Sequence, residues 1–266
     1  MKTVSRPAVV SLLLALGGLL GCRLSQQTSA REVRVCVEDE NMPFSNGRAE
    51  GFEDRIAELF ADDVGAHLER VTLPPGSSLD KESIVANRCD MVVGVPRRLE
   101  LMPATRPYYR ATWVFVSSKS LGEPVTSFDD PRLKKLRIGV PVVGSHGAEL
   151  APMHALSRRG ITLNVRKFPV YVDDPADPSP LAQLRALTAG EIDVAILWGP
   201  HAGWFVEDRG KLSITKVTPE VDHGEPLAYD VAIGAKDDAL RAELDAFLAR
   251  RADDVDAIIR TYGVPR

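Results

Sequence analysis

The chain has 266 residues, of which 26% are charged and 44% are hydrophobic, and its formal net charge is −4. A weakly acidic chain without a run of Lys and Arg does not fit a nucleic-acid-binding protein. This length is sufficient for one or two hydrophobic cores, and no apolar segment beyond the N-terminus is long enough to span a membrane.

The N-terminus has the pattern of an export signal. Two basic residues within the first six positions precede an apolar run over residues 8–20, which is shorter than the roughly 20 residues of a membrane-spanning helix. The run ends in Leu-Leu-Gly-Cys at Cys22, similar to the lipobox of bacterial lipoproteins. We predict a signal peptide over 1–21, lipid modification of Cys22 and a tether over 22–30. The alternative is ordinary signal cleavage nearby, which leaves Cys22 unmodified.

The first folded segment has the pattern of a strand, a loop and a helix. Residues 33–37 are rich in β-branched side chains and predict a strand, and a polar loop follows over 38–51. Apolar residues recur at helical spacing over 52–64, and Gly65 is placed to end that helix. The continuous apolar run 90–95 then predicts a buried parallel strand.

A similar pattern returns in the second half of the chain. Residues 137–140 predict a strand, and the glycine-rich turn Gly-Ser-His-Gly follows at 144–147. Helical patterns over 150–156 and 181–189 lead into a second buried strand over 193–197. The second half therefore has the same order of elements as the first.

The repetition predicts an α/β fold of two lobes. Residues 86–90 and 189–193 both read as a helix end, a turn and an Asp before a buried strand. The extended runs 110–119 and 227–236 are placed to cross between the lobes, and apolar spacing over 240–262 predicts one final helix. We expect each lobe to hold a mostly parallel sheet flanked by helices, with the two crossover strands as a hinge and a cleft between the lobes.

Beyond Cys22, the chain contains only Cys36 and Cys89. An even pair of cysteines in an exported chain predicts a disulfide, and the repeat places the two strands that carry them side by side. Two buried free thiols are the alternative.

Candidate ligand-binding residues follow the ends of strands. In open parallel sheets, ligands meet the loops beyond the carboxyl ends, where Phe44 lies in the first lobe and Trp198 in the second. Trp198 can supply a flat apolar wall, with Gly199-Pro200 turning the chain behind it. Alternatively, Phe44 and Trp198 belong to the cores of their lobes. His201 is a further candidate, although a lone His is more often a structural hydrogen-bond partner than a catalyst.

Other motifs limit the chemistry. Ser145, in the glycine-rich turn before a helix, offers a hydroxyl and backbone N–H groups to a ligand, or it simply caps that helix. The His residues have no metal-ligand spacing, and neither a nucleophile elbow nor a phosphate loop occurs. We therefore expect no metal and no cofactor.

Several motifs together resemble a known family. The stretches "RVCVEDENMPFSN" and "GFEDRIAELFADDVG" resemble the opening of periplasmic solute-binding proteins of the amino-acid-receptor type. One branch, the substrate-binding proteins associated with quinoprotein (methanol-type) dehydrogenases, is the most similar. The stretches that carry this second resemblance are "RCDMVVGVP", "TRPYYRATWVFV", "DDPRLKKLRIGV", "GEIDVAILWGPHAGWF" and "IIRTYGVP". The resemblance extends over 32–266.

This resemblance implies lobe one over 31–116 and 225–266, and lobe two over 117–224. It also implies export to the periplasm, a small organic ligand, and either an ABC permease or a periplasmic quinoprotein dehydrogenase as partner, with a lipid anchor as the only membrane contact.

The chain departs from the amino-acid receptors at the ligand. Those receptors carry a Thr-x-Glu-Arg segment whose Arg binds the ligand carboxylate. Here Arg97 or Arg98 would have to replace it. They also place an Asp where this chain has Trp198, so an amino acid is not the expected ligand.

The resemblance leaves two other classes open. Exported cyclohexadienyl dehydratases share this fold and need a general acid in the cleft; Glu53 and His201 are available, but no second catalytic partner is evident. The chain could also be a dehydrogenase accessory protein that acts only through its surface. We expect a binding protein rather than an enzyme.

Overall fold

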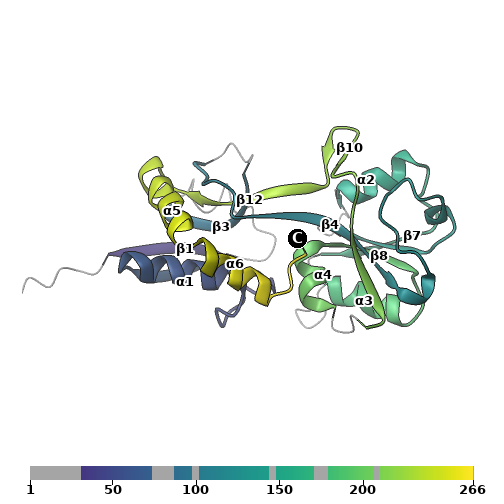
Figure 1. The fold of residues 1–266 in the computed structure, drawn as a ribbon, viewed down its shortest axis with the longest axis horizontal. Helices are drawn as coiled ribbons and strands as arrows, with labels where there is room; N and C mark the ends of the chain where they lie inside the picture. Colours follow the sequence, from purple (N-terminus) through teal and green to yellow (C-terminus); the bar gives the residue numbers. More distant parts are fainter. Residues whose placement is uncertain are drawn as a thin grey trace, which may run out of the picture.

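The computed structural model describes residues 31–73, 87–97, 102–143, 148–170, 179–206 and 210–265. These residues form two α/β lobes that lie end to end (Figure 1). Within them, no helix combines the length and the apolar character needed to cross a membrane. The expected signal peptide with Cys22, the turn 144–147 that holds Ser145, and Arg98 lie outside the described residues.

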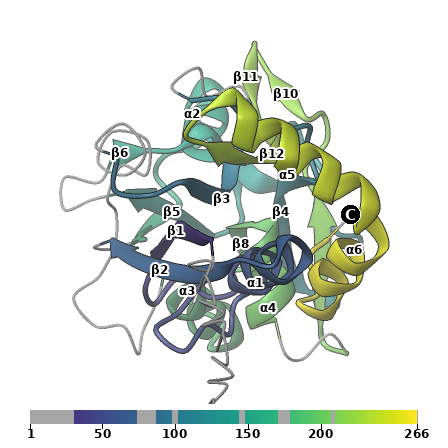
Figure 2. The same ribbon diagram turned by 90° about the vertical axis from the view of Figure 1, so that its left-hand side faces the viewer.

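The first lobe, which faces the viewer in Figure 2, contains a four-stranded sheet in the order β2-β1-β3-β12. β1 runs parallel to both β2 and β3, whereas β12 is antiparallel to β3. The strands are β1 (Glu32–Glu38), β2 (His67–Leu73), β3 (Met91–Pro96) and β12 (Ala228–Ala235), and the helices are α1 (Phe52–Val64), α5 (Asp238–Arg250) and α6 (Ala252–Thr261).

Side chains of β1 alternate between the two faces of this sheet, as strand geometry requires. Val33 and Val35 enter the main core beneath α1, α5 and α6, which includes Phe60 and Phe247. Cys36 enters a smaller core on the opposite face. There a disulfide joins Cys36 to Cys89, as the sequence predicts, with the two Cα atoms 5.6 Å apart.

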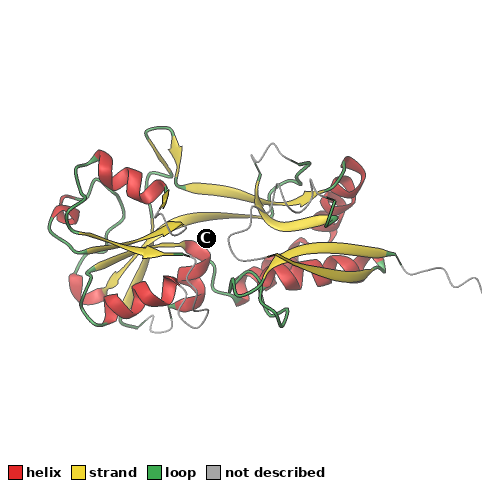
Figure 3. Cartoon of the chain, turned by 180° about the vertical axis from the view of Figure 1, so that it is seen from behind, coloured by secondary structure: helices red, strands yellow, loops and turns green. Residues whose placement is uncertain are grey.

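The second lobe has a core on each face of its sheet, in which β5 runs parallel to β7 and β8 (Figure 3). Two very short strands, β10 (Val221–Asp222) and β11 (Glu225–Pro226), form a separate hairpin. The remaining strands are β4 (Tyr109–Ser118), β5 (Ile138–Val143), β6 (Ala148–Glu149), β7 (Val165–Pro169), β8 (Val194–Trp198) and β9 (Leu212–Lys216). The helices are α2 (Ala151–Arg158), α3 (Ser179–Thr188) and α4 (Gly199–Phe205), with single 3-10 turns at Lys119–Leu121 and Pro131–Lys134.

Two crossover strands connect the lobes, as predicted. β4 and β12 pair antiparallel over four residues, from Ala228 opposite Thr112 to Val231 opposite Tyr109. Through this pairing the sheets of both lobes become one continuous hydrogen-bonded sheet. The chain therefore has the two-lobed architecture expected from its repeated halves.

Two local expectations were wrong. The final helix is divided at Arg251 into α5 and α6, although the apolar spacing from Leu248 to Val255 fits an unbroken helix. Gly199-Pro200 does not form a turn but begins helix α4. Proline is tolerated in a first helical turn because its missing N–H has no intrahelical partner there.

The repeated Asp residues form the same contact in both lobes. The Asp90 carboxylate accepts hydrogen bonds from the backbone N–H of Arg34 at 2.9 Å and from its guanidinium at 3.1 Å. In lobe two, the Asp193 carboxylate accepts from the backbone N–H of Arg137 at 2.7 Å and from its guanidinium at 2.6 Å. Each Asp thereby connects the amino-terminal ends of neighbouring parallel strands.

Candidate functional site

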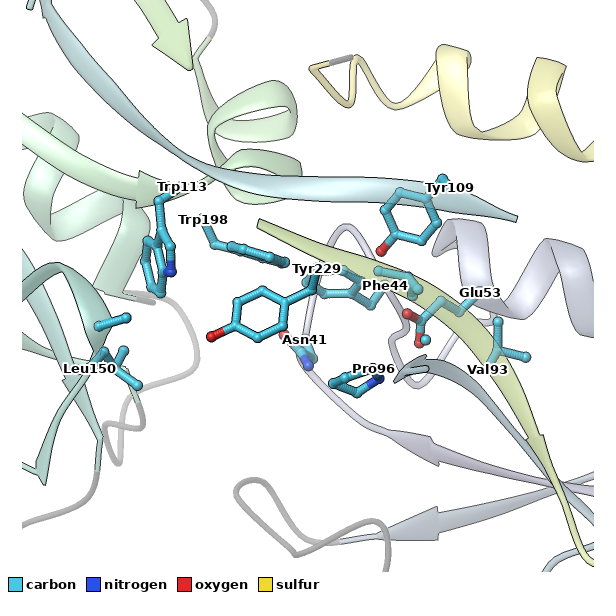
Figure 4. Close-up of a pocket in the computed structure, with 13 residues that line it drawn as sticks. Asn41, Phe44, Glu53, Val93, Pro96, Tyr109, Trp113, Leu150, Trp198 and Tyr229 are labelled. Carbon is cyan, nitrogen blue, oxygen red and sulfur yellow. The ribbon is translucent and has the colours of Figure 1, made fainter. Parts of the chain in front are cut away.

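A cavity of about 310 Å³ lies between the lobes. Its walls come from the loop after β1, from α1 and β3 of lobe one, from both crossover strands, and from β8 and the start of α2 in lobe two (Figure 4). Its size is at the lower end of the range of about 300–1,000 Å³ for ligand pockets. Five aromatic residues line it: Phe44, Tyr109, Trp113, Trp198 and Tyr229.

Three of these rings form one aromatic wall. Trp113 on β4 lies directly opposite Trp198 on β8 in the strand register, and their ring centroids are 5.4 Å apart. Tyr229 on β12 packs against the other side of Trp198 at 5.8 Å. Each indole is therefore held by cross-strand pairing and by a neighbouring ring.

Lobe one contributes Phe44 from a loop that the start of α1 holds in place. The Phe44 carbonyl accepts the backbone N–H of Glu53 at 3.0 Å. The buried Asp54 carboxylate accepts from the Gly51 N–H at 3.0 Å and from the Arg70 guanidinium at 2.9 Å. The first N–H groups of α1 are thus satisfied within the protein and are not free to bind an anion.

Glu53 is the one acidic residue among the described residues that line the cavity. Its carboxylate lies against the backbone of β3 at Gly94. A Cβ atom at Gly94 would be 1.9 Å from Glu53 Oε1, and Gly94 has φ +87°. Glycine is therefore required here both by the backbone conformation and by the position of the carboxylate.

The surroundings of Glu53 favour its neutral form when the cavity holds no ligand. Burial raises the pKa of the Glu53 carboxyl well above its ordinary value, and the nearby Asp54 and Glu38 carboxylates raise it further. Among the described residues, no side chain donates a hydrogen bond to Glu53 or pairs with it as an ion. This carboxyl is therefore free to form an ion pair with a cationic ligand, or to donate a hydrogen bond to a neutral one.

The structure brings together two of the residues singled out from the sequence. Phe44 and Trp198, from different lobes, line the same cavity. Arg97 is exposed, donates its backbone N–H to the Asp230 carbonyl at 2.9 Å, and is not among the residues that line the cavity.

His201 lies behind the cavity wall rather than on it. Its ring meets Phe44 edge-on across the lobes, with centroids 5.2 Å apart at 82°. Burial lowers the pKa of His201 to about 4, so the imidazole is neutral at ordinary pH. Its other ring neighbour is Phe205, at 6.3 Å between centroids, so it packs between two aromatic residues.

Residues of the crossover strands line the cavity, although none of them was predicted as a site residue from the sequence. Tyr109 and Trp113 on β4 are four residues apart, and Tyr229 and Val231 on β12 are two apart, so each pair faces the same side of its strand. This period-two spacing was the sequence feature that could have placed these residues on one common face of each strand. No group of three or more His, Cys, Asp or Glu side chains suited to a metal ion occurs in the part of the chain that the structure describes.

Sequence comparisons identify the proteins to which this chain is similar. The family model described as bacterial extracellular solute-binding protein matches residues 90–264. Protein MoxJ of Methylorubrum extorquens is 27% identical over 97% of this chain and 93% of its own length.

Solved structures agree as well. The crystal structure of the periplasmic binding protein XoxJ from Methylobacterium extorquens AM1 is 31% identical, with a TM-score of 0.70 over 88% of this chain and 98% of that one. An ancestral cationic amino acid solute-binding protein is 16% identical, with a TM-score of 0.64 over 87% of this chain and 95% of that one, and shows likeness of fold alone. The family match, the 31% identity and the interlobe cavity lead to one conclusion: this chain belongs to the bacterial extracellular solute-binding protein family.

Proposed function

We propose that this protein is an exported, lipid-anchored binding protein that captures a small organic ligand in its interlobe cavity and works in the periplasm. Its partner is an ABC permease or a periplasmic quinoprotein dehydrogenase. The observation that carries the proposal is the cavity itself, since both lobes and both crossover strands supply its walls. A ligand in this position contacts both lobes and both crossover strands, so its binding favours the closed arrangement in a hinge motion.

The proposed lobe boundaries follow from the same architecture. We infer that lobe one comprises 31–116 and 225–266, that lobe two comprises 117–224, and that β4 and β12 form the hinge. The dehydrogenase is proposed from the sequence motifs that resemble the dehydrogenase-associated branch, and the permease from membership of the extracellular solute-binding protein family.

An enzymatic role has one observation in its favour. A carboxyl kept neutral by burial, as Glu53 is, has the character of a general acid. However, His201 does not line the cavity, and no Lys, Arg or His is among the described residues that do. A lone acid beside aromatic walls suits binding better than turnover.

Two measurements test the proposal. Mass spectrometry of small molecules released from freshly purified protein should identify one bound compound at near-stoichiometric amounts. Trp198→Ala should then lower the affinity for that compound by about tenfold or more, because one of the main apolar walls is removed.

Trp204→Ala is the matched control. Trp204 is 41% exposed and stacks on Tyr262 outside the cavity, at 5.3 Å between centroids. This variant should keep the affinity of the unmodified protein. Equal losses in both variants would mean that the pocket lies elsewhere.

A further inference from the structure

The cavity combines aromatic walls with a single unpaired acid. Five rings and one carboxyl, Glu53, face a space of about 310 Å³, and the described lining residues include no cation. A buried carboxyl ionises only beside a partner of opposite charge, and the described residues supply none for Glu53, so a cationic ligand is the partner that the cavity lacks. The composition of the walls therefore points to the charge of the occupant.

We propose that the ligand is a small methylated ammonium cation, which the aromatic rings enclose and the Glu53 carboxylate neutralises. This inference rests on the proposed function, because it assumes that the interlobe cavity is the binding site. It adds the chemical class of the ligand.

The rings are placed to hold such a cation. A cation within about 6 Å of an aromatic centroid is attracted by the face of the ring, most strongly by Trp, and cages of such rings bind quaternary ammonium groups. Trp113, Trp198 and Tyr229 supply one side of the cavity, and Phe44 and Tyr109 approach from the other (Figure 4). The occupant is thus surrounded by rings from both lobes.

A quaternary ammonium fits this cavity better than a primary one. A primary ammonium carries three N–H donors, each of which needs an acceptor once it is buried. Beside Glu53, the side-chain acceptors among the described lining residues are the Asn41 amide oxygen and the hydroxyls of Tyr109 and Tyr229, which are neutral and weaker acceptors than a carboxylate. A methylated nitrogen has few or no N–H donors, so a wall of rings with one carboxylate is sufficient.

An anion is disfavoured on two grounds. No cation lies among the described residues that line the cavity, and the one near Glu53, Arg70, is already paired with Asp54 at 2.9 Å. The backbone N–H groups at the start of α1 are also used, since the carbonyls of Pro43 and Phe44 accept them.

The environment of Glu53 adds a measurable consequence. The groups that face its carboxyl are Asp54 on its own helix, Glu38 of β1, and the phenols of Tyr108 and Tyr109, none of which is a cation. Because burial holds the pKa of Glu53 high, an arriving cation should ionise this carboxyl and release a proton. Cation binding should therefore tighten as pH rises.

The test is calorimetric titration with choline and with 3,3-dimethyl-1-butanol, a neutral alcohol of the same shape. We expect choline to bind at least about tenfold more tightly at pH 8, because the Glu53 carboxylate neutralises its charge and the faces of the rings attract it. Its binding heat should also vary with the ionisation enthalpy of the buffer, because a proton is released.

Glu53→Gln should remove most of this preference and the dependence on buffer. Glu58→Gln makes the same chemical change on the same helix, outside the cavity, and should leave both unchanged. Loss of the preference in both variants would overturn the role of Glu53.

Other outcomes separate this inference from the proposed function. If the alcohol binds as tightly as choline, the cavity is a binding site but the inference that its ligand is a cation is wrong. If neither probe binds while a released compound binds in a Trp198-dependent manner, the ligand class is wrong and the function stands. If no compound is released or bound at all, the proposed function itself fails.

Discussion

The two lobes use the same contact at one end of their sheets and different chemistry at the other. At the amino-terminal ends of the parallel strands, Asp90 and Asp193 each bind the backbone N–H and the guanidinium of an Arg on the neighbouring strand. At the carboxyl ends, lobe one presents Glu53 and lobe two presents Trp198. The repeated contact maintains the sheets, whereas the ends that differ form the cavity.

Lobe one is also reinforced where lobe two is not. The Cys36–Cys89 disulfide crosses from β1 to the turn before β3, and Lys236 adds a second cation to Asp90 at 2.8 Å. The Asp193 side chain is 27% exposed and has Arg137 as its ion-pair partner. Lobe one should therefore depend more strongly on its Asp and on its covalent link.

Removal of the disulfide should have the largest effect. The bond closes a loop with a sequence separation of 53 residues, and loss of such a bond typically costs about 2–4 kcal/mol in the free energy of unfolding. Cys36→Ser with Cys89→Ser should lower the unfolding midpoint in urea accordingly. Hydrogen exchange should place the loss in lobe one, and equal loosening of both lobes would contradict the comparison.

The two repeated Asp residues should differ in their pH dependence. Burial alone would raise the pKa of Asp90, but hydrogen bonds from Arg34 and Lys236 outweigh it and lower the pKa from 3.8 to about 2. A lowered carboxyl pKa stabilises the fold above pH 3.8, and this contribution is lost as pH falls toward 2.

Asp90→Asn should therefore cost about 2 kcal/mol of unfolding free energy at pH 7, measured by urea denaturation. Asp193→Asn, at the more exposed position, should cost about 1 kcal/mol or less. Equal costs would show that reinforcement of lobe one is not concentrated at Asp90.

Glu53 should give the smallest effect on stability, and one of opposite sign. Its raised pKa means that the folded protein binds more protons than the unfolded chain above the ordinary carboxyl pKa, so stability falls as pH rises through that window. Glu53→Gln should flatten this fall and match or slightly exceed the unmodified protein at pH 8, measured by thermal unfolding without ligand. A less stable variant at pH 8 would mean that Glu53 has a partner that stabilises its ionised form.

Much of the fold could be predicted from the sequence because buried parallel strands appear as continuous apolar runs. The repeated Asp before such runs located the corresponding strands β3 and β8, and the ends of strands located Phe44 after β1 and Trp198 at the end of β8. The break at Arg251 was not predictable, because the apolar residues on either side keep a helical spacing.

The cavity itself was harder to anticipate. Tyr109, Trp113 and Tyr229 alternate with polar residues such as Arg110 and Asp230, so the pattern marks one face of each crossover strand but does not distinguish a core face from a cavity face. Glu53 follows a buried Phe at a helix start, where an acidic residue is ordinary, and its role depends on the glycine at position 94 on another strand.

The most direct test of the site is a crystal structure with arsenocholine, in which arsenic replaces the quaternary nitrogen and gives an anomalous signal. We expect one peak inside the cavity, within about 6 Å of the Trp198 ring and with the Glu53 carboxylate beside it. A peak outside the cavity, or an empty cavity at a concentration that saturates calorimetric binding, would contradict it.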